Sequence, residues 1–136
     1  MSKRILIVDD SPLVRNLIRA YFDHETDFEI CGESIDGVDA IEKAEQLKPD
    51  LIILDAAMPR MNGIQAARVL RSMDRDVPII LFTLHADMIS PSEARETGIT
   101  AVVSKMDKIS ELSRQVEYHL HSARYRAIGS QASSQP

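Results

Sequence analysis

The stretch Pro49-Asp-Leu-Ile-Ile-Leu-Asp55 encloses four consecutive apolar residues between an aspartate that follows a proline and a second aspartate. Similar apolar runs occur at residues 5–8, 79–82 and 101–103, and none of them alternates with polar residues. A strand is a continuous apolar run when both faces of its sheet are covered, as in parallel α/β sheets. These runs therefore predict four buried strands of such a sheet.

A fifth strand is predicted at residues 28–33, where two sets of side chains alternate. Phe28, Ile30 and Gly32 form one set, and Glu29, Cys31 and Glu33 form the other. Because alternation is typical of a strand with one covered face, we expect this strand at an edge of the sheet.

The segments between the strands carry apolar residues at helical spacing. Ser11 is suited to cap a first helix with Pro12 at its first position, and further apolar stripes begin near residues 38, 62 and 108. Strand and helix thus follow each other five times. This order predicts an α/β fold, a doubly wound five-stranded parallel sheet with right-handed crossovers, flanked by five helices.

The helix after the fourth strand is expected to be short. Pro91 suits only the first turn of a helix, and Ser90 with Glu93 three residues later has the sequence pattern of a capping box. We therefore predict a helix over residues 91–97 that ends at Gly98, preceded by a long and mobile loop at residues 84–89.

The bulk composition fits one domain of ordinary size, with 136 residues of which 44% are hydrophobic. We expect residues 1–126 to form it and residues 127–136 to be a disordered tail or the start of a linker. A formal net charge of −5 argues against direct contact with nucleic acid. The single cysteine excludes a disulfide within the chain, and the short apolar runs exclude a membrane span, so we expect a cytoplasmic protein.

Reactive side chains follow the predicted strands, at the edge where ligands bind in open α/β sheets. Asp9 and Asp10 end the first strand, Asp55 the third, Thr83 the fourth, and Lys105 follows the fifth. Three carboxylates placed close together repel one another unless a cation lies among them. Oxygen ligands of this kind suit Mg²⁺, which also binds phosphate oxygens.

These residue types indicate phosphoryl transfer. We predict that Asp55 is the nucleophile, because a carboxylate attacks without prior deprotonation. Asp9 and Asp10 are expected to hold the metal, Lys105 to neutralise phosphate, and Thr83 to donate a hydrogen bond to a phosphoryl oxygen.

The runs Ile5-Leu-Ile-Val-Asp-Asp10 and Pro49-Asp-Leu-Ile-Ile-Leu-Asp55 resemble the receiver domains of two-component response regulators, with Met58-Pro59, Asn62-Gly63, Thr83 and Lys105 in the same order. The resemblance covers about residues 3–124. It implies a flavodoxin-like sheet of strand order 2-1-3-4-5, with Asp55 as phosphoacceptor and a metal site for Mg²⁺, or Mn²⁺ in its place, at Asp9, Asp10, Asp55 and the Ala57 carbonyl. It implies a sensor histidine kinase or phosphotransfer protein as the donor of the phosphoryl group and a protein effector downstream. It does not decide whether the protein forms a homodimer.

Other positions depart from the resembled family or have an open role. Val102 stands where an aromatic residue is frequent, and Met106 where proline is frequent after the lysine, while Pro91 is unusual for the fourth helix. Ala57 and His85 lie two residues past Asp55 and Thr83, where the resemblance implies an influence on hydrolysis; an exposed loop histidine is the alternative. Arg60 is expected to be solvated or to contact a kinase.

Alternatives to a phosphorylation switch stay open at this point. The chain is also compatible with a binding module that has lost the switch, with an FMN binder on the same fold, and with a phosphatase that uses a nucleophilic aspartate. A stand-alone receiver and a fragment of a longer regulator have the same sequence pattern, and we favour the first. Asp9→Ala or Asp10→Ala is expected to stabilise the metal-free fold by relieving repulsion.

Overall fold

The computed structural model describes the backbone of residues 2–133 and the side chains of residues 2–121. It holds one sheet of five parallel strands in the order β2-β1-β3-β4-β5. The strands are β1 (Arg4–Val8), β2 (Glu29–Ser34), β3 (Leu51–Leu54), β4 (Ile79–Thr83) and β5 (Ala101–Ser104). The predicted fold class and strand order are confirmed, and β2 lies at an edge as expected.

Five α-helices connect or follow the strands, as predicted. They are α1 (Pro12–Glu25), α2 (Gly37–Leu47), α3 (Gly63–Met73), α4 (Pro91–Thr97) and α5 (Ile109–Ser133). The short α4 begins after the Ser90 cap, has Pro91 in its first turn and ends at Gly98 in the left-handed conformation, as the sequence indicates. The loop predicted at 84–89 contains a 3₁₀ turn, η1 (Ala86–Met88); its mobility stays a prediction.

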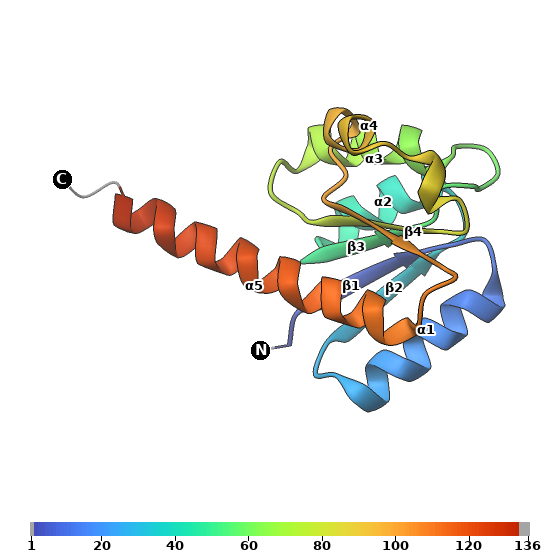
Figure 1. Ribbon diagram of the computed structural model, residues 1–136, viewed down its shortest axis with the longest axis horizontal. Coiled ribbons are helices and arrows are strands. Elements are labelled where there is room, and N and C mark those ends of the chain that lie inside the picture. Colours follow the sequence, from blue (N-terminus) through green and yellow to red (C-terminus); the bar gives the residue numbers. More distant parts are fainter. Residues whose placement is uncertain (1, 134–136) are drawn as a thin grey trace.

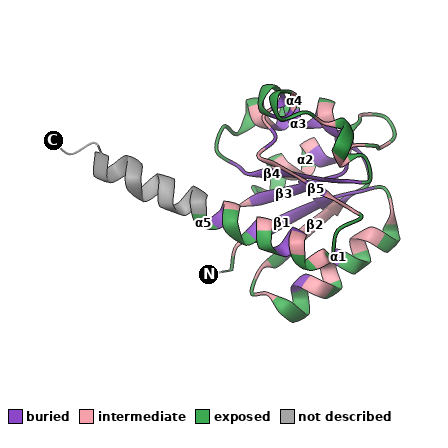
Figure 2. Cartoon of the chain, viewed as in Figure 1, coloured by how far each residue is buried: buried purple, intermediate pink, exposed green. Residues whose placement is uncertain are grey.

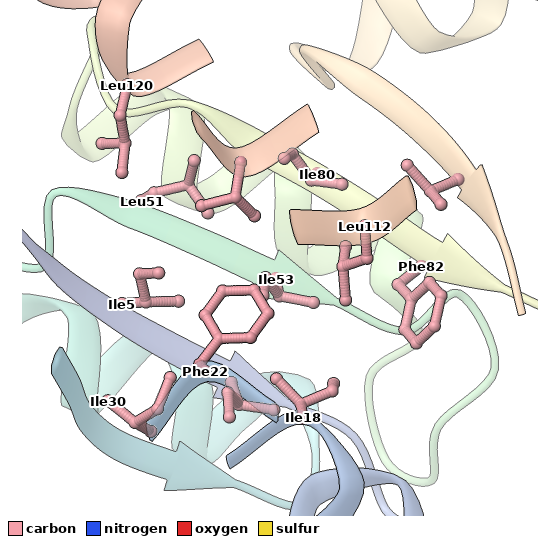
Figure 3. Packing of buried hydrophobic residues seen from close by; sticks show 13 residues of the cluster. Ile5, Ile18, Phe22, Ile30, Leu51, Ile53, Ile80, Phe82, Leu112 and Leu120 are labelled. Atoms are coloured by element: carbon pink, nitrogen blue, oxygen red, sulfur yellow. The ribbon is translucent and has the colours of Figure 1, made fainter. Parts of the chain in front are cut away.

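The helices cover the sheet in two layers. α1 and α5 lie on one face, and α2, α3 and α4 lie on the other (Figure 1). The strand side chains alternate between two apolar clusters, one under each layer, so the three central strands are buried apart from the half-buried Arg4 that begins β1 (Figure 2). On the α1–α5 side, the Phe22 ring of α1 packs among Ile5, Ile53 and Ile18 (Figure 3).

The strict alternation expected for β2 is interrupted by an irregularity. The pairing register with β1 shifts, so that Ile5 pairs with Ile30 whereas Leu6 pairs with Gly32. Ile30 lies in the α1–α5 cluster, but a Cβ added to Gly32 would meet Leu47 of α2 at 2.7 Å, on the opposite face. The expected grouping of Gly32 with Ile30 is therefore wrong, because a bulge moves the later residues to the other phase.

The boundary predicted at residue 126 lies inside α5, which extends to Ser133. The side chains of 122–133 and all of 134–136 lie outside the described residues, so the division into a domain of 1–126 and a tail of 127–136 stays a prediction. No helix of the described part combines the length and apolar character that crossing a bilayer requires.

Candidate phosphoryl-transfer site

Two neighbouring parallel strands bring Asp9 and Asp55 together. β1 and β3 run in register, with Val8 opposite Leu54, so the residues that follow leave the sheet side by side. The Asp55 backbone N–H continues the ladder by donating to the Val8 carbonyl at 2.9 Å. One carboxylate oxygen of each of Asp9, Asp10 and Asp55 lies within 4.8 Å of the others, which is the convergence expected from the strand ends.

The ammonium of Lys105 lies between two of these carboxylates. Its Nζ is 2.7 Å from Asp9 Oδ2 and 3.4 Å from Asp55 Oδ1. The lysine reaches this position because its backbone N–H donates to the Thr83 carbonyl at 2.9 Å, just past the paired ends of β4 and β5. Nζ also lies 5.9 Å from the centre of the Phe82 ring, so an aromatic face borders the cation on one side.

The two adjacent aspartates differ in their surroundings. Asp9 is 2% exposed, and its carboxylate accepts hydrogen bonds from the Ser11 backbone N–H at 2.9 Å and from Lys105. Asp10 is exposed. A buried carboxylate with two hydrogen bonds and an exposed one therefore stand next to each other at the end of β1.

The surroundings of Asp55 raise the pKa of its carboxyl. Burial raises the pKa of its carboxyl above the ordinary value of 3.8, and the Asp9 charge raises it further; Lys105 and a hydrogen bond from the Ala57 backbone act in the opposite direction. Burial is the larger cause of the raised pKa, and the Asp9 charge adds to it even though Lys105 lies beside both carboxylates.

The chain turns sharply after Asp55 and returns to start α3. The Gly63 N–H donates to the Ala56 carbonyl at 2.9 Å, and a Cβ added to Gly63 would lie 2.1 Å from the Asp55 carbonyl oxygen. Only a glycine permits this approach, so α3 begins directly against the backbone of the predicted phosphoacceptor. Ala57 lies in this loop and is exposed, and the role of its carbonyl stays a prediction.

Thr83 is fully buried at the end of β4. Its Oγ1 accepts a hydrogen bond from the His85 backbone N–H at 3.1 Å, which ties the side chain to the first turn of the 84–89 loop. His85 itself is exposed, so both interpretations of its role remain open.

Sequence reasoning missed two arginines that hold the surroundings of the site. Arg60 is not merely solvated: its Nη2 lies 2.6 Å from Oδ2 of Asp36, the residue that caps α2. Arg15 of α1 donates to the Asp9 carbonyl at 2.8 Å and to Glu33 of β2 at 3.0 Å. The wide separation of Arg60 from Asp36, and of Arg15 from Glu33, gives no local sequence signal for either pair.

The donor atoms of the cluster fit a hard divalent cation. All of them are carboxylate oxygens, which Mg²⁺ prefers, and the Asp9 charge is one of the causes, after burial, that raise the pKa of the Asp55 carboxyl. Asp10 is exposed, so one member of the group is accessible to solvent.

Comparison with known proteins gives a consistent picture. A family model described as the response regulator receiver domain matches residues 5–117. The transcriptional regulatory protein PdtaR of Mycobacterium tuberculosis is 39% identical over 126 residues, which are 93% of this chain and 60% of that protein. A protein-glutamate methylesterase/protein-glutamine glutaminase of Nocardioides sp. is 33% identical over 116 residues, 84% of this chain and 32% of that protein.

Among solved structures, a two-component response regulator of the LuxR family from Aurantimonas sp. matches with a TM-score of 0.82 at 28% identity, over 90% of this chain and 87% of that one. The chain spans 60% or less of the length of the two curated relatives above. The sequence similarity therefore covers only part of those two relatives, and in this chain it coincides with the residues that match the receiver-domain model.

Proposed function

The chain belongs to the response regulator receiver domain family, and from this premise we propose that it is a switch operated by phosphorylation of Asp55. One observation supports the proposal most: the Lys105 ammonium lies between the carboxylates of Asp9 and Asp55 at the ends of three strands. Asp55 is then the nucleophile, with a cation already beside the position that the phosphoryl group takes.

The transfer needs no deprotonation of the nucleophile. A carboxylate oxygen of Asp55 attacks the phosphorus of a phosphohistidine, a new O–P bond forms, and the P–N bond breaks. The released imidazole takes a proton from solvent. As charge moves onto the phosphoryl oxygens, Lys105 shifts from Asp9 towards them, since its Nζ is a point charge on a flexible stem.

Asp9, Asp10, Asp55 and the carbonyl of Ala57 are proposed to hold a Mg²⁺ ion, with Mn²⁺ as a substitute. When bound, this ion neutralises charge on the phosphoryl oxygens. The chain's own contribution is to keep the oxygen donors together while Lys105 offsets part of their repulsion.

Thr83 is proposed to relay the change. Its hydroxyl accepts from the His85 N–H, so rotation of the hydroxyl towards a phosphoryl oxygen alters the start of the 84–89 loop. Local chemistry thereby becomes a change of shape beside α4.

The domain is proposed to return to its resting state by itself. Water attacks the phosphorus, the acyl phosphate O–P bond breaks, and the Asp55 carboxylate and inorganic phosphate are restored. The small side chain of Ala57 leaves room for this water. An orienting role for His85 remains the second option beside that of a plain loop residue.

The proposed donors are a sensor histidine kinase or a phosphotransfer protein, and the proposed receiver of the signal is a protein effector. This domain does not contact nucleic acid or a membrane in our proposal, and a homodimer remains an option. The cytoplasmic location and the division at residue 126 stay predictions.

Mass spectrometry tests the assignment directly. We expect the protein to gain the mass of one phosphoryl group with acetyl phosphate and Mg²⁺, and peptide mapping to locate it at Asp55. Asp55→Asn should gain none, whereas Asp50→Asn, which alters the other end of β3, should react as the wild type does. No gain with acetyl phosphate or beryllofluoride would overturn the proposal in favour of a module that has lost its switch.

Hydrogen exchange tests the relay separately. Thr83→Ala is expected to accept the phosphoryl group yet to lose the change in exchange at residues 84–89, and Thr83→Ser is expected to retain it. An unchanged response in Thr83→Ala would remove Thr83 from the relay.

A further inference from the structure

We infer that Arg15 is a positioning residue for the acidic cluster: it holds the Asp9 carbonyl and thereby sets the direction of Asp10. The inference rests on the proposed function, since it concerns the same cation site. Arg15 itself touches neither the carboxylate oxygens of the cluster nor the predicted path of the phosphoryl group in any contact described.

The start of α1 brings Arg15 to this position. Ser11 caps the helix through the Val14 N–H, and Pro12 occupies its first turn. The Arg15 N–H then donates to the Ser11 carbonyl at 3.1 Å. One turn into the helix, the side chain folds back over the end of β1, where Nη1 donates to the Asp9 carbonyl at 2.8 Å.

Glu33 of β2 holds the Nε side of the Arg15 guanidinium, while Nη1 donates to the Asp9 carbonyl. Its Oε1 accepts from Arg15 Nε at 3.0 Å, and its Oε2 accepts from Arg19 Nη2 at 2.7 Å. The Arg15 side chain is only 16% exposed, so it has little freedom to leave this arrangement. The planar fork makes two directed hydrogen bonds at once, which a lysine does not reproduce.

Because the peptide bond between Asp9 and Asp10 is planar, the Arg15 hydrogen bond to the Asp9 carbonyl also fixes the position of Asp10. The Asp9 carbonyl, the Asp10 nitrogen and the Asp10 Cα lie in one plane, so a carbonyl held in one direction places the next Cα. The Asp9 N–H donates to the Ser34 carbonyl at 3.0 Å, and its carboxylate is held by Ser11 and Lys105. The orientation of the exposed Asp10 therefore depends on the Asp9–Asp10 peptide, whose carbonyl Arg15 holds.

Positioning and charge predict opposite effects on cation binding. As a positive charge near the cluster, Arg15 repels a divalent cation, so neutralising it would tighten binding if charge alone mattered. As a support behind the ligands, its removal would loosen them, and outer partners of metal ligands typically contribute about 10- to 100-fold in affinity. The sign of the change therefore separates the two roles.

Calorimetric titration with Mg²⁺ alone gives the test. We expect Arg15→Gln and Arg15→Lys to weaken Mg²⁺ binding by about tenfold or more. Arg19→Gln is the matched control, because it removes a charge from the same Glu33 but leaves the Asp9 carbonyl contact; it should stay within about threefold of wild type. Thermal melts establish that each variant is folded.

The outcomes divide clearly. Equal or tighter Mg²⁺ binding by a folded Arg15→Gln, or an equal loss in Arg19→Gln, would overturn the inference while leaving the proposed function intact. A wild-type protein that binds no Mg²⁺ would overturn both. Should Arg15→Gln not fold, Arg15→Lys decides, because it keeps the charge and loses the fork.

Discussion

Lys105 is bound closer to Asp9 than to Asp55: Nζ lies 2.7 Å from an oxygen of the first and 3.4 Å from an oxygen of the second. In this resting arrangement the ammonium holds together two carboxylates that would otherwise repel each other. Both carboxylate side chains are less than a tenth exposed, so the repulsion is only weakly screened.

Lys105→Met should therefore destabilise the metal-free protein. Breaking a buried ion pair typically costs about 3 kcal/mol or more, which corresponds to a melting temperature lower by roughly 10 °C in a domain of this size. Added Mg²⁺ should raise the melting temperature of this variant more than that of the wild type, because the cation takes over the lost charge. Lys108→Met, which changes an exposed lysine nearby, should have little effect on the melting temperature; an equal loss there would contradict the argument.

Asp9 and Asp10 differ in burial and in their partners, a difference that the sequence does not reveal. Asp10→Asn removes an exposed charge from the cluster and should leave the metal-free protein equally stable or more stable by up to about 1 kcal/mol. Asp9→Asn removes the partner of Lys105 and should cost about 2 kcal/mol. Both should weaken Mg²⁺ binding. Denaturant unfolding with and without Mg²⁺ measures both effects. An Asp9→Asn protein more stable than the wild type would instead support the expectation from the sequence that removing either carboxylate stabilises the metal-free fold.

The strand ends were predictable because they follow from simple periodicity. Uninterrupted apolar runs give buried parallel strands, and the residues after Val8 and Leu54 must then meet at one edge. The bulge in β2 was not predictable, because an extra residue leaves the apolar pattern of 28–33 almost unchanged. The arginine contacts depend on side-chain rotamers and on the packing of elements far apart in the chain, which the spacing of residues does not encode.

Arg60 and Asp36 join the loop that follows Asp55 to the start of α2. The Asp36 side chain is 3% exposed whereas that of Arg60 is 62% exposed, and the Met61 carbonyl accepts from the Gly37 N–H at 3.2 Å beside them. A double-mutant cycle of Arg60→Gln and Asp36→Asn should give a measurable coupling energy, since asparagine preserves the cap and removes only the charge. The exposed pair Arg114 and Glu111 should give a smaller coupling energy. Equal coupling energies for the two pairs would show that burial of Asp36 adds nothing.

Glu33 should make stability depend on pH. Burial raises its pKa, but the hydrogen bonds and charges of Arg19 and Arg15 outweigh this and hold the pKa below its ordinary value of 4.5. A group with a lowered pKa in the folded state stabilises the protein above its unfolded pKa and loses this contribution as the pH falls through its folded value. Glu33→Gln should thus be less stable by about 1 kcal/mol at pH 7, with a difference that shrinks below pH 4.5. A difference that stays constant down to acid unfolding would exclude this linkage.

Gly63 and Gly32 offer a direct test of how tightly α3 is placed against the site. A Cβ at Gly63 would lie 2.1 Å from the Asp55 carbonyl oxygen, a backbone atom that moves only with β3 or α3. A Cβ at Gly32 would meet the end of the Leu47 side chain at 2.7 Å, and that side chain can rotate away. Gly63→Ala should therefore cost about 3 kcal/mol and slow phosphorylation of Asp55, while Gly32→Ala should cost about 1 kcal/mol and leave the rate unchanged. Chemical denaturation and the rate of mass gain with acetyl phosphate check both expectations; a Gly63→Ala protein of wild-type stability would mean that the loop after Asp55 is free to shift and does not fix the acceptor.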